Sequence, residues 1–281
     1  MRKSTKAIIA ALSASIMCAA PVAATFAGTA AVTSITAEAA STVSFTYQKL
    51  KYNLNTSTKE AALAGVSDAN LVNLTLPATI TYGGSTYKIT KIEDSAFRGN
   101  TKLKTVNLSS AIYLKDLGRY TFMECSSLTS VKLSSSVTKM GNCNFAECTK
   151  LSSFDFVSQQ ITDIAPYAFR NCKNLKSINI PHSVKCISAS AFCSAGLTSV
   201  YISNNVEKIH MSAFQMCDNL TTVTLEGGVS KEIEVYRNAF AYCPKLKTVH
   251  ANRTNINAWY FVFEGSNNVQ IDGVGASQFH S

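Results

Sequence analysis

The sequence predicts a solenoid of short β-strands, in which about eight similar coils stack along one axis. Three observations lead to this fold class: a phenylalanine recurs every 22 to 26 residues, an aliphatic residue follows most of these phenylalanines at a fixed distance, and a short alternating apolar segment comes next. A unit of this length is too small to bury its own apolar face, whereas stacked units share one continuous core.

The phenylalanines define the repeat. They are Phe97, Phe122, Phe145, Phe169, Phe192, Phe214, Phe240 and Phe263, separated by 25, 23, 24, 23, 22, 26 and 23 residues. Alanine precedes most of them, and the A-F segment is too short for a regular helix. We therefore expect a helical turn whose phenylalanine enters the core from the wall opposite the strands. An aliphatic residue stands five positions before most of the phenylalanines, as Ile92 does before Phe97.

Each unit also contains a strand signature of the form apolar-polar-apolar, nine residues after the phenylalanine. Val106 and Leu108 form the first, and Val131 and Leu133 form the next. Side chains alternate between the two faces of a strand, so these residues are predicted to point inward and their neighbours outward. With strands about 4.8 Å apart, eight coils stack to roughly 40 Å.

The first 39 residues have the pattern of an export signal. Arg2, Lys3 and Lys6 precede an apolar, alanine-rich stretch, and the Ala37-Glu38-Ala39 segment has the spacing that signal peptidase requires. Cleavage after Ala39 or Ala40 is expected, with an uncleaved anchor or a lipoprotein at Cys18 as alternatives. Removal changes the formal charge from +9 to (26 − 3) − (17 − 1) = +7. The sequence predicts no transmembrane segment in the mature chain.

Residues 40–86 have a different rhythm and are expected to form a β-rich N-terminal cap on the array, because an open solenoid end exposes apolar core. Gly83 and Gly84 predict a tight turn between two of its strands. The array itself covers 87–272, and 273–281 is expected to be a loose tail. Trp259, Tyr260 and Phe261 crowd the final unit; closure of the last coil is the favoured interpretation, and an aromatic ligand platform is the alternative.

The unit I-x-x-x-A-F-x-x-C-x-x-L-x-x-V-x-L resembles the leucine-rich repeats of BspA-like surface proteins, also called the Treponema pallidum type. The resemblance covers residues 87–272 and implies a leucine-rich repeat solenoid. It also implies a secreted or cell-surface bacterial protein, since several members of the family are adhesins for host matrix proteins or other bacteria. The pattern departs from the family at Ala195 and at Ser266, which stand where five of the other units have cysteine.

Five of the nine cysteines occupy one repeat position. Cys125, Cys148, Cys172, Cys217 and Cys243 lie three residues after the repeat phenylalanine. Asn100 holds the same position in the first unit, which indicates a small side chain facing the inner backbone. We predict a column of buried, reduced thiols rather than disulfides. Cys143, Cys186 and Cys193 lie outside this column. The alternative is that one of these three cysteines forms a disulfide or is reactive. Without a CxxC pair, no metal site is predicted.

Several functional classes are disfavoured. The content of 46% hydrophobic and 15% charged residues argues against disorder. The basic residues are scattered instead of clustered with aromatics, so no nucleic-acid partner is expected. No G-x-S-x-G, H-E-x-x-H or phosphate-binding loop occurs, and the four histidines stand at unrelated repeat positions. We therefore expect no enzyme and no cofactor.

The outward strand positions supply the candidate binding face. One column holds only serine and threonine, which β-propensity and solubility explain. The next is varied, and from it we select Lys132, Asp155, Asn179, Tyr201, Thr224 and His250 as candidate partner-binding residues. The sequence thus predicts a secreted or cell-surface module that binds protein, on a host matrix or a bacterial surface. The alternatives are a structural spacer, whose outward face is merely solvated, and a non-catalytic binder of cell-wall carbohydrate.

Overall fold

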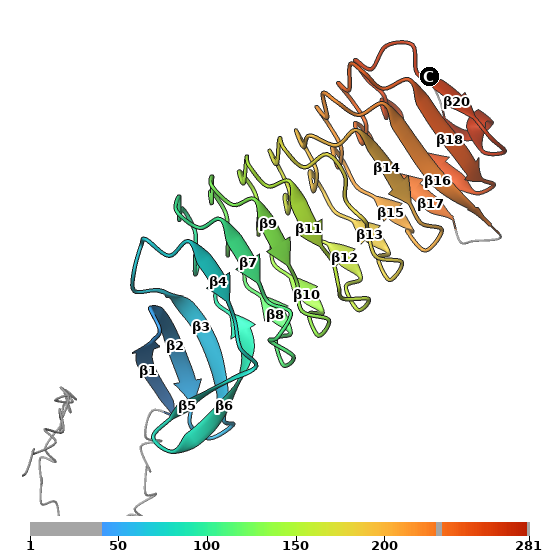
Figure 1. The fold of residues 1–281 in the computed structure, drawn as a ribbon. Coiled ribbons are helices and arrows are strands. Elements are labelled where there is room, and N and C mark those ends of the chain that lie inside the picture. The colour runs from blue at the N-terminus through green and yellow to red at the C-terminus, as the bar shows by residue number, and fades with distance from the viewer. Residues whose placement is uncertain (1–40, 229–231, 280–281) are drawn as a thin grey trace, which may run out of the picture. The chain divides into compact units, whose positions relative to one another are not determined.

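The computed structural model describes residues 41–228 and 232–279, which form a stack of coils built from short β-strands (Figure 1). This confirms the predicted solenoid. The predicted signal peptide lies outside the described residues. No helix in the described part of the chain is long and apolar enough to span a membrane.

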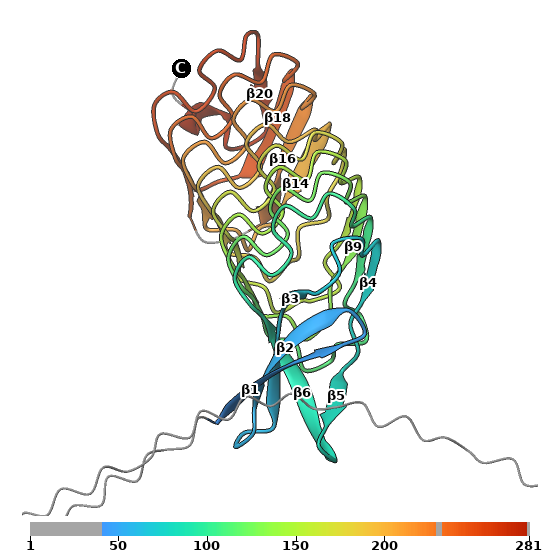
Figure 2. The same ribbon diagram turned by 90° about the vertical axis from the view of Figure 1, so that its left-hand side faces the viewer.

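The first wall of the coils carries the predicted strands. One parallel sheet contains β4 (Asn73–Thr75), β7 (Thr105–Asn107), β9 (Ser130–Lys132) and β11 (Ser153–Asp155). A second contains β14 (Ser199–Ile202), β16 (Thr222–Gly228), β18 (Thr248–Arg253) and β20 (Gln270–Asp272). Figure 2 shows these strands following one side of the stack. Val106 and Leu108 are buried as predicted. Strand β4, inside the segment assigned to the cap, is already part of this wall.

A second strand in each coil, which the sequence did not predict, forms the second wall. Here lie β6 (Ser85–Ile92), β8 (Asp116–Leu117), β10 (Lys139–Met140), β12 (Asp163–Ile164), β13 (Cys186–Ile187), β15 (Lys208–Ile209), β17 (Ile233–Val235) and β19 (Ile256–Ala258). These strands hold the aliphatic residues that stand five positions before each phenylalanine. Ile92, Leu117 and Ile164 are fully buried, so this wall also contributes side chains to the core.

The third wall carries the repeat phenylalanines, whose rings stack along the whole array. Neighbouring ring centres from Phe97 to Phe263 lie 5.1 to 5.9 Å apart, with the planes within 20° of parallel. The N–H of every repeat phenylalanine from Phe97 to Phe240 also donates to the next coil, as Phe97 does to the carbonyl of Thr121 at 2.9 Å. The array is therefore joined through both side chains and backbone on this wall.

The expected helical turn is instead a series of tight turns with left-handed residues. In all eight coils the residues two before and two after the phenylalanine have φ between 54° and 71°. Gly99 and Gly265 suit this conformation, but most of these positions hold larger residues such as Tyr120 and Glu124. The hydrogen bonds between neighbouring coils on this wall offset the conformational cost, which is why the sequence shows no glycine pattern here.

The N-terminal strands β1 (Thr42–Tyr47), β2 (Leu50–Asn55), β3 (Glu60–Val66) and β5 (Thr79–Tyr82) join β6 at one end of the stack (Figure 1). Strands β5 and β6 form the predicted hairpin, with Gly83 and Gly84 at φ of 54° and 75°. Positive φ at both central residues matches the turn that tight hairpins favour. The end of the array next to β6 is thus covered by a mixed sheet, in which β3 pairs with β6 in parallel and the other N-terminal pairs are antiparallel.

The predicted burial of the cysteine column is confirmed. All five of its members are buried, and no described cysteine is in a disulfide. Each thiol donates to the carbonyl of the repeat phenylalanine one coil earlier, with Sγ–O distances of 3.1 to 3.2 Å. Burial raises the pKa of Cys125 to about 12 and that of Cys148 well above its usual value. Cys143, Cys186 and Cys193 are partly exposed.

The last coil differs from the sequence prediction. Trp259, Tyr260 and Phe261 do not close it, because their side chains are 50%, 67% and 62% exposed. The core is instead closed by the buried Val262 and by Phe263, whose ring contacts Phe279 at 5.4 Å. Residues 273–279, expected to be loose, contain the short 3-10 helix η1 (Ala276–Gln278) and pack against this end.

Candidate functional site

The first wall is interrupted near the middle of the array. Its first sheet ends at β11 and its second begins at β14, and the coil between them contributes no strand to either sheet (Figure 1). Within the described sheets, neither β11 nor β14 has a partner strand on the side that faces this coil. Regular pairing resumes at Thr198, whose N–H donates to the carbonyl of Lys176 at 3.0 Å.

Two phenylalanines account for the interruption. Phe154 and Phe156 occupy inward positions that hold valine and leucine in β9, and both are more than nine-tenths buried. The ring of Phe154 lies 5.0 and 4.8 Å from the rings of Phe145 and Phe169. Interiors are close-packed, so the added volume displaces its neighbours. The equivalent residues of the next coil, including Ile180, are only partly buried.

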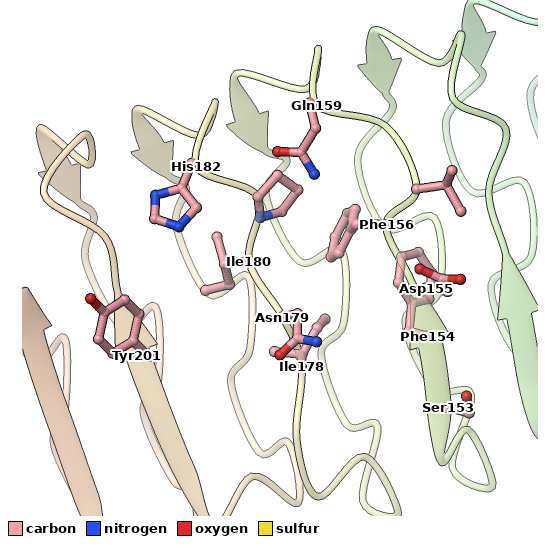
Figure 3. Close-up of a pocket in the computed structure, with 12 residues that line it drawn as sticks. Ser153, Phe154, Asp155, Phe156, Gln159, Ile178, Asn179, Ile180, His182 and Tyr201 are labelled. Atoms are coloured by element: carbon pink, nitrogen blue, oxygen red, sulfur yellow. The ribbon is translucent and has the colours of Figure 1, made fainter.

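The interruption opens a groove of about 680 Å³ on the first wall. Its apolar lining comes from Phe154, Phe156, Val157, Ile178, Ile180 and Pro181, and its polar lining from Ser153, Asp155, Gln159, Asn179, His182 and Tyr201. Figure 3 shows Phe156 and Ile180 between Asp155 on one side and Tyr201 on the other. An apolar floor with a few convergent polar groups is typical of ligand sites.

The structure brings together three of the six candidate residues. Asp155, Asn179 and Tyr201 line the groove, and Lys132 lies beside Asp155 in register on β9. Thr224 and His250 follow Tyr201 on β16 and β18 and lie outside the groove. The ring of His250 is within 2.8 Å of the carboxylate of Asp272.

Tyr201 is positioned by a hydrogen bond to the carboxylate of Glu226, one coil further on. This bond raises the pKa of Tyr201 and lowers that of Glu226, which also accepts from the backbone N–H of Asn204 at 2.8 Å. The tyrosine is 50% exposed, so its ring presents apolar surface while its hydroxyl is fixed. Amphipathic aromatic residues of this kind often anchor interfaces.

Sequence reasoning missed the apolar floor, together with Gln159, His182 and Glu226. A signal for the floor existed in Phe154 and Phe156, which depart from the valine and leucine of other units. For the other three residues there was no signal, because they stand at positions whose residue type differs from coil to coil. In the described part of the chain, no group of three His, Cys, Asp or Glu side chains is placed to hold a metal ion.

Comparisons with solved structures support the fold. A leucine rich cell surface protein of Faecalibacterium prausnitzii A2-165 is 21% identical, with a TM-score of 0.52, over 82% of this chain and 76% of that chain. The Treponema pallidum leucine rich repeat protein is 22% identical, with a TM-score of 0.62, over 72% of this chain and 90% of that chain.

A search of curated proteins returned no match. The family model for the BspA type leucine rich repeat region matches in six copies, over residues 68–160 and 156–270. These segments cover most of the chain and include every strand from β4 to β19. The chain therefore belongs to the BspA-type leucine-rich repeat family, as its repeat pattern predicted.

Proposed function

We propose that this protein is a cell-surface binding module that takes an extended segment of a partner protein into the groove between β11 and β14. The observation that carries the proposal is the interrupted sheet, which combines an apolar floor with strand edges that lack a partner strand among the described residues. Leucine-rich repeats otherwise serve as protein-binding or structural modules, and this groove favours binding.

The chemistry of the groove suits a peptide. An unpaired strand edge offers N–H and C=O groups that an added strand can pair with, while side-chain pockets supply selectivity. Phe156 and Ile180 provide the apolar contact, and Asp155 and Tyr201 stand on its two sides (Figure 3). The carboxylate of Asp155 favours a partner segment with an apolar residue next to a basic one.

We propose in addition that the protein is not an enzyme. The thiols of Cys125, Cys148 and Cys172 donate hydrogen bonds in the core, and burial raises their pKa, so they do not serve as nucleophiles. A surface location is supported by the Faecalibacterium relative, which is described as a cell surface protein. Adhesion to a host matrix or to another bacterium is the role that fits a broad, ordered and non-catalytic face.

An array of purified matrix proteins and glycans, probed with the purified chain, tests this function. We expect binding to at least one protein, weakened about tenfold by Tyr201→Ala, because a half-exposed interface tyrosine contributes about 1.4 kcal/mol or more. Lys132→Ala is expected to weaken binding less. Thermal stability should not change, because neither side chain is buried.

Tyr167→Ala is the matched control, since Tyr167 is a similarly exposed tyrosine on the third wall. It should leave binding unchanged. Unchanged affinity in both Tyr201→Ala and Lys132→Ala would contradict the assignment of the binding site to the groove. The site would then lie on the turns or the caps. Failure to bind any protein would contradict the adhesion role itself.

A further inference from the structure

A second aromatic column, separate from the core phenylalanines, runs along the outside of the last three coils. His210, Tyr236 and Trp259 directly follow strands β15, β17 and β19. The rings of His210 and Tyr236 are stacked at 4.9 Å with planes 11° apart, and those of Tyr236 and Trp259 at 5.4 Å and 17°. Trp259 therefore presents one face to Tyr236.

This column is not required by the scaffold. The same position holds Glu93, Gly118, Gly141, Ala165 and Ser188 in the five earlier coils. At Gly118 an added Cβ would lie 2.5 Å from the carboxylate of Asp94, so that coil has no room for a side chain at this position. Only the last three coils carry aromatic residues at this position, which the other coils fill with glutamate, glycine, alanine or serine, so the aromatic stack points to a role beyond packing.

Trp259 is at the end of the column. Strand β19 is the last strand of its sheet, and Trp259 remains 50% exposed although one of its faces is against Tyr236. Tyr260 and Phe261, which are even more exposed, extend the apolar surface beside it. As shown above, the last coil is closed by other residues. A flat indole surface is thus presented to solvent at this end of the array.

Polar groups flank the column at a fixed spacing. Residues two apart on a strand share one face, which places Glu234 beside Tyr236 and Asn257 beside Trp259. The hydroxyl of Tyr236 donates to the carboxylate of Glu234, which confirms this placement. Glu234 also lies in register with Asn257 on the neighbouring strand. Hydrogen-bond acceptors and an amide donor therefore border the aromatic surface.

From this geometry we propose a second binding site, in which the free face of Trp259 stacks on a pyranose ring of a neutral oligosaccharide and Glu234 and Asn257 bind its hydroxyl groups. The C–H face of a sugar with equatorial hydroxyls is flat and apolar, so it suits an indole ring. The carboxylate of Glu234, which also forms an ion pair with Lys208 at 3.8 Å, accepts hydrogen bonds that sugar hydroxyls donate and that the phosphates of nucleic acid cannot donate, although a base also stacks on aromatic rings. The site is independent of the proposed groove, which lies on the first wall.

The chain contains a single tryptophan, so its intrinsic fluorescence reports directly on this site. We expect a saturable change in Trp259 emission on titration with β-1,4-linked hexasaccharides of glucose or of N-acetylglucosamine. Glu234→Gln should weaken the binding of whichever hexasaccharide binds more tightly by about tenfold, because one hydrogen bond to a charged group is lost. Trp259→Ala should abolish binding measured by calorimetry.

Tyr120→Ala, an exposed tyrosine on the third wall, is the control and should leave the titration unchanged. Tyr201→Ala should also leave it unchanged, which separates this site from the groove. The proposal would be overturned if neither hexasaccharide altered the emission. It would also be overturned if Trp259→Ala, with unchanged thermal stability, retained the wild-type affinity.

Discussion

Replacement of Phe169 by alanine tests how the array is held together. Phe169 is fully buried in the middle of the stack, and its ring contacts four others. The ring centres of Phe145 and Phe192 lie 5.7 and 5.2 Å away along the column, and those of Phe154 and Phe156 lie 4.8 and 5.9 Å away across the core. No other repeat phenylalanine has more ring contacts among the described residues.

The expected loss follows from these contacts. Burial of a phenylalanine and the cavity left on its removal together amount to about 3–5 kcal/mol. Aromatic pairs add roughly 0.5–1.5 kcal/mol each beyond burial, so we expect the upper end, about 4–5 kcal/mol. This is at least about a quarter of the 5–15 kcal/mol by which native proteins are stable.

Urea denaturation followed by far-UV circular dichroism and by Trp259 fluorescence measures the loss. The first signal reports on all strands and the second on the last coils, so coincident transitions in the wild type would show that the array unfolds as one unit. Phe261→Ala is the control, because its side chain is 62% exposed and its removal should change stability by less than about 0.5 kcal/mol. A loss below about 2 kcal/mol for Phe169→Ala would refute the stacked-core account.

Three further predictions concern the cysteine column and Ser266, which holds the same repeat position in the last coil. The five column thiols should react slowly with a thiol reagent in the native state and fully after unfolding, and mass spectrometry that found several disulfides would contradict this. Because burial raises the pKa of Cys125 from 9.0 to about 12, the native state keeps a proton that the unfolded chain releases, so stability should fall as the pH rises from 9 towards 12. In Cys125→Ala, the midpoint of urea unfolding should fall less steeply over this pH range than in the wild type. An unchanged slope would contradict the role of Cys125 in this pH dependence. The hydroxyl of Ser266 accepts from the N–H of Cys243 and donates to the carbonyl of Phe240, both at 2.8 Å. Ser266→Ala should therefore lower the free energy of unfolding by about 1 kcal/mol, and Ser266→Cys should lower it less. Equal losses in the two variants would show that serine and cysteine are not equivalent at this position.

The repeat could be predicted because its spacing is set by packing. A side chain that must meet its equivalent in the next coil recurs at the coil length, so the phenylalanines, the column cysteines and the inward strand residues were all visible. The second wall was not, since strands such as β8 and β10 have two residues and no alternation to detect. The left-handed turns were hidden for a related reason: hydrogen bonds between coils stabilise them, and few of them use glycine.

The candidate site was predicted only in part, because it depends on how one coil deviates from its neighbours. Asp155, Asn179 and Tyr201 belong to an outward column, but the groove that unites them exists because Phe156 fills the core beneath. Tertiary packing decides such features. The same holds for Arg253, a fully buried arginine that donates to the carbonyl of Val206 at 2.7 Å across two coils.

The central claim is that a protein partner occupies the groove, and amide hydrogen exchange tests it most directly. The chain would be measured alone and with the protein that binds most strongly on the array. The account predicts that residues 153–157 and 177–182 become protected on binding, because the partner strand pairs with the edge of β11 and covers the apolar floor. Protection confined to the third wall or to either end of the array, with these two segments unchanged, would contradict it.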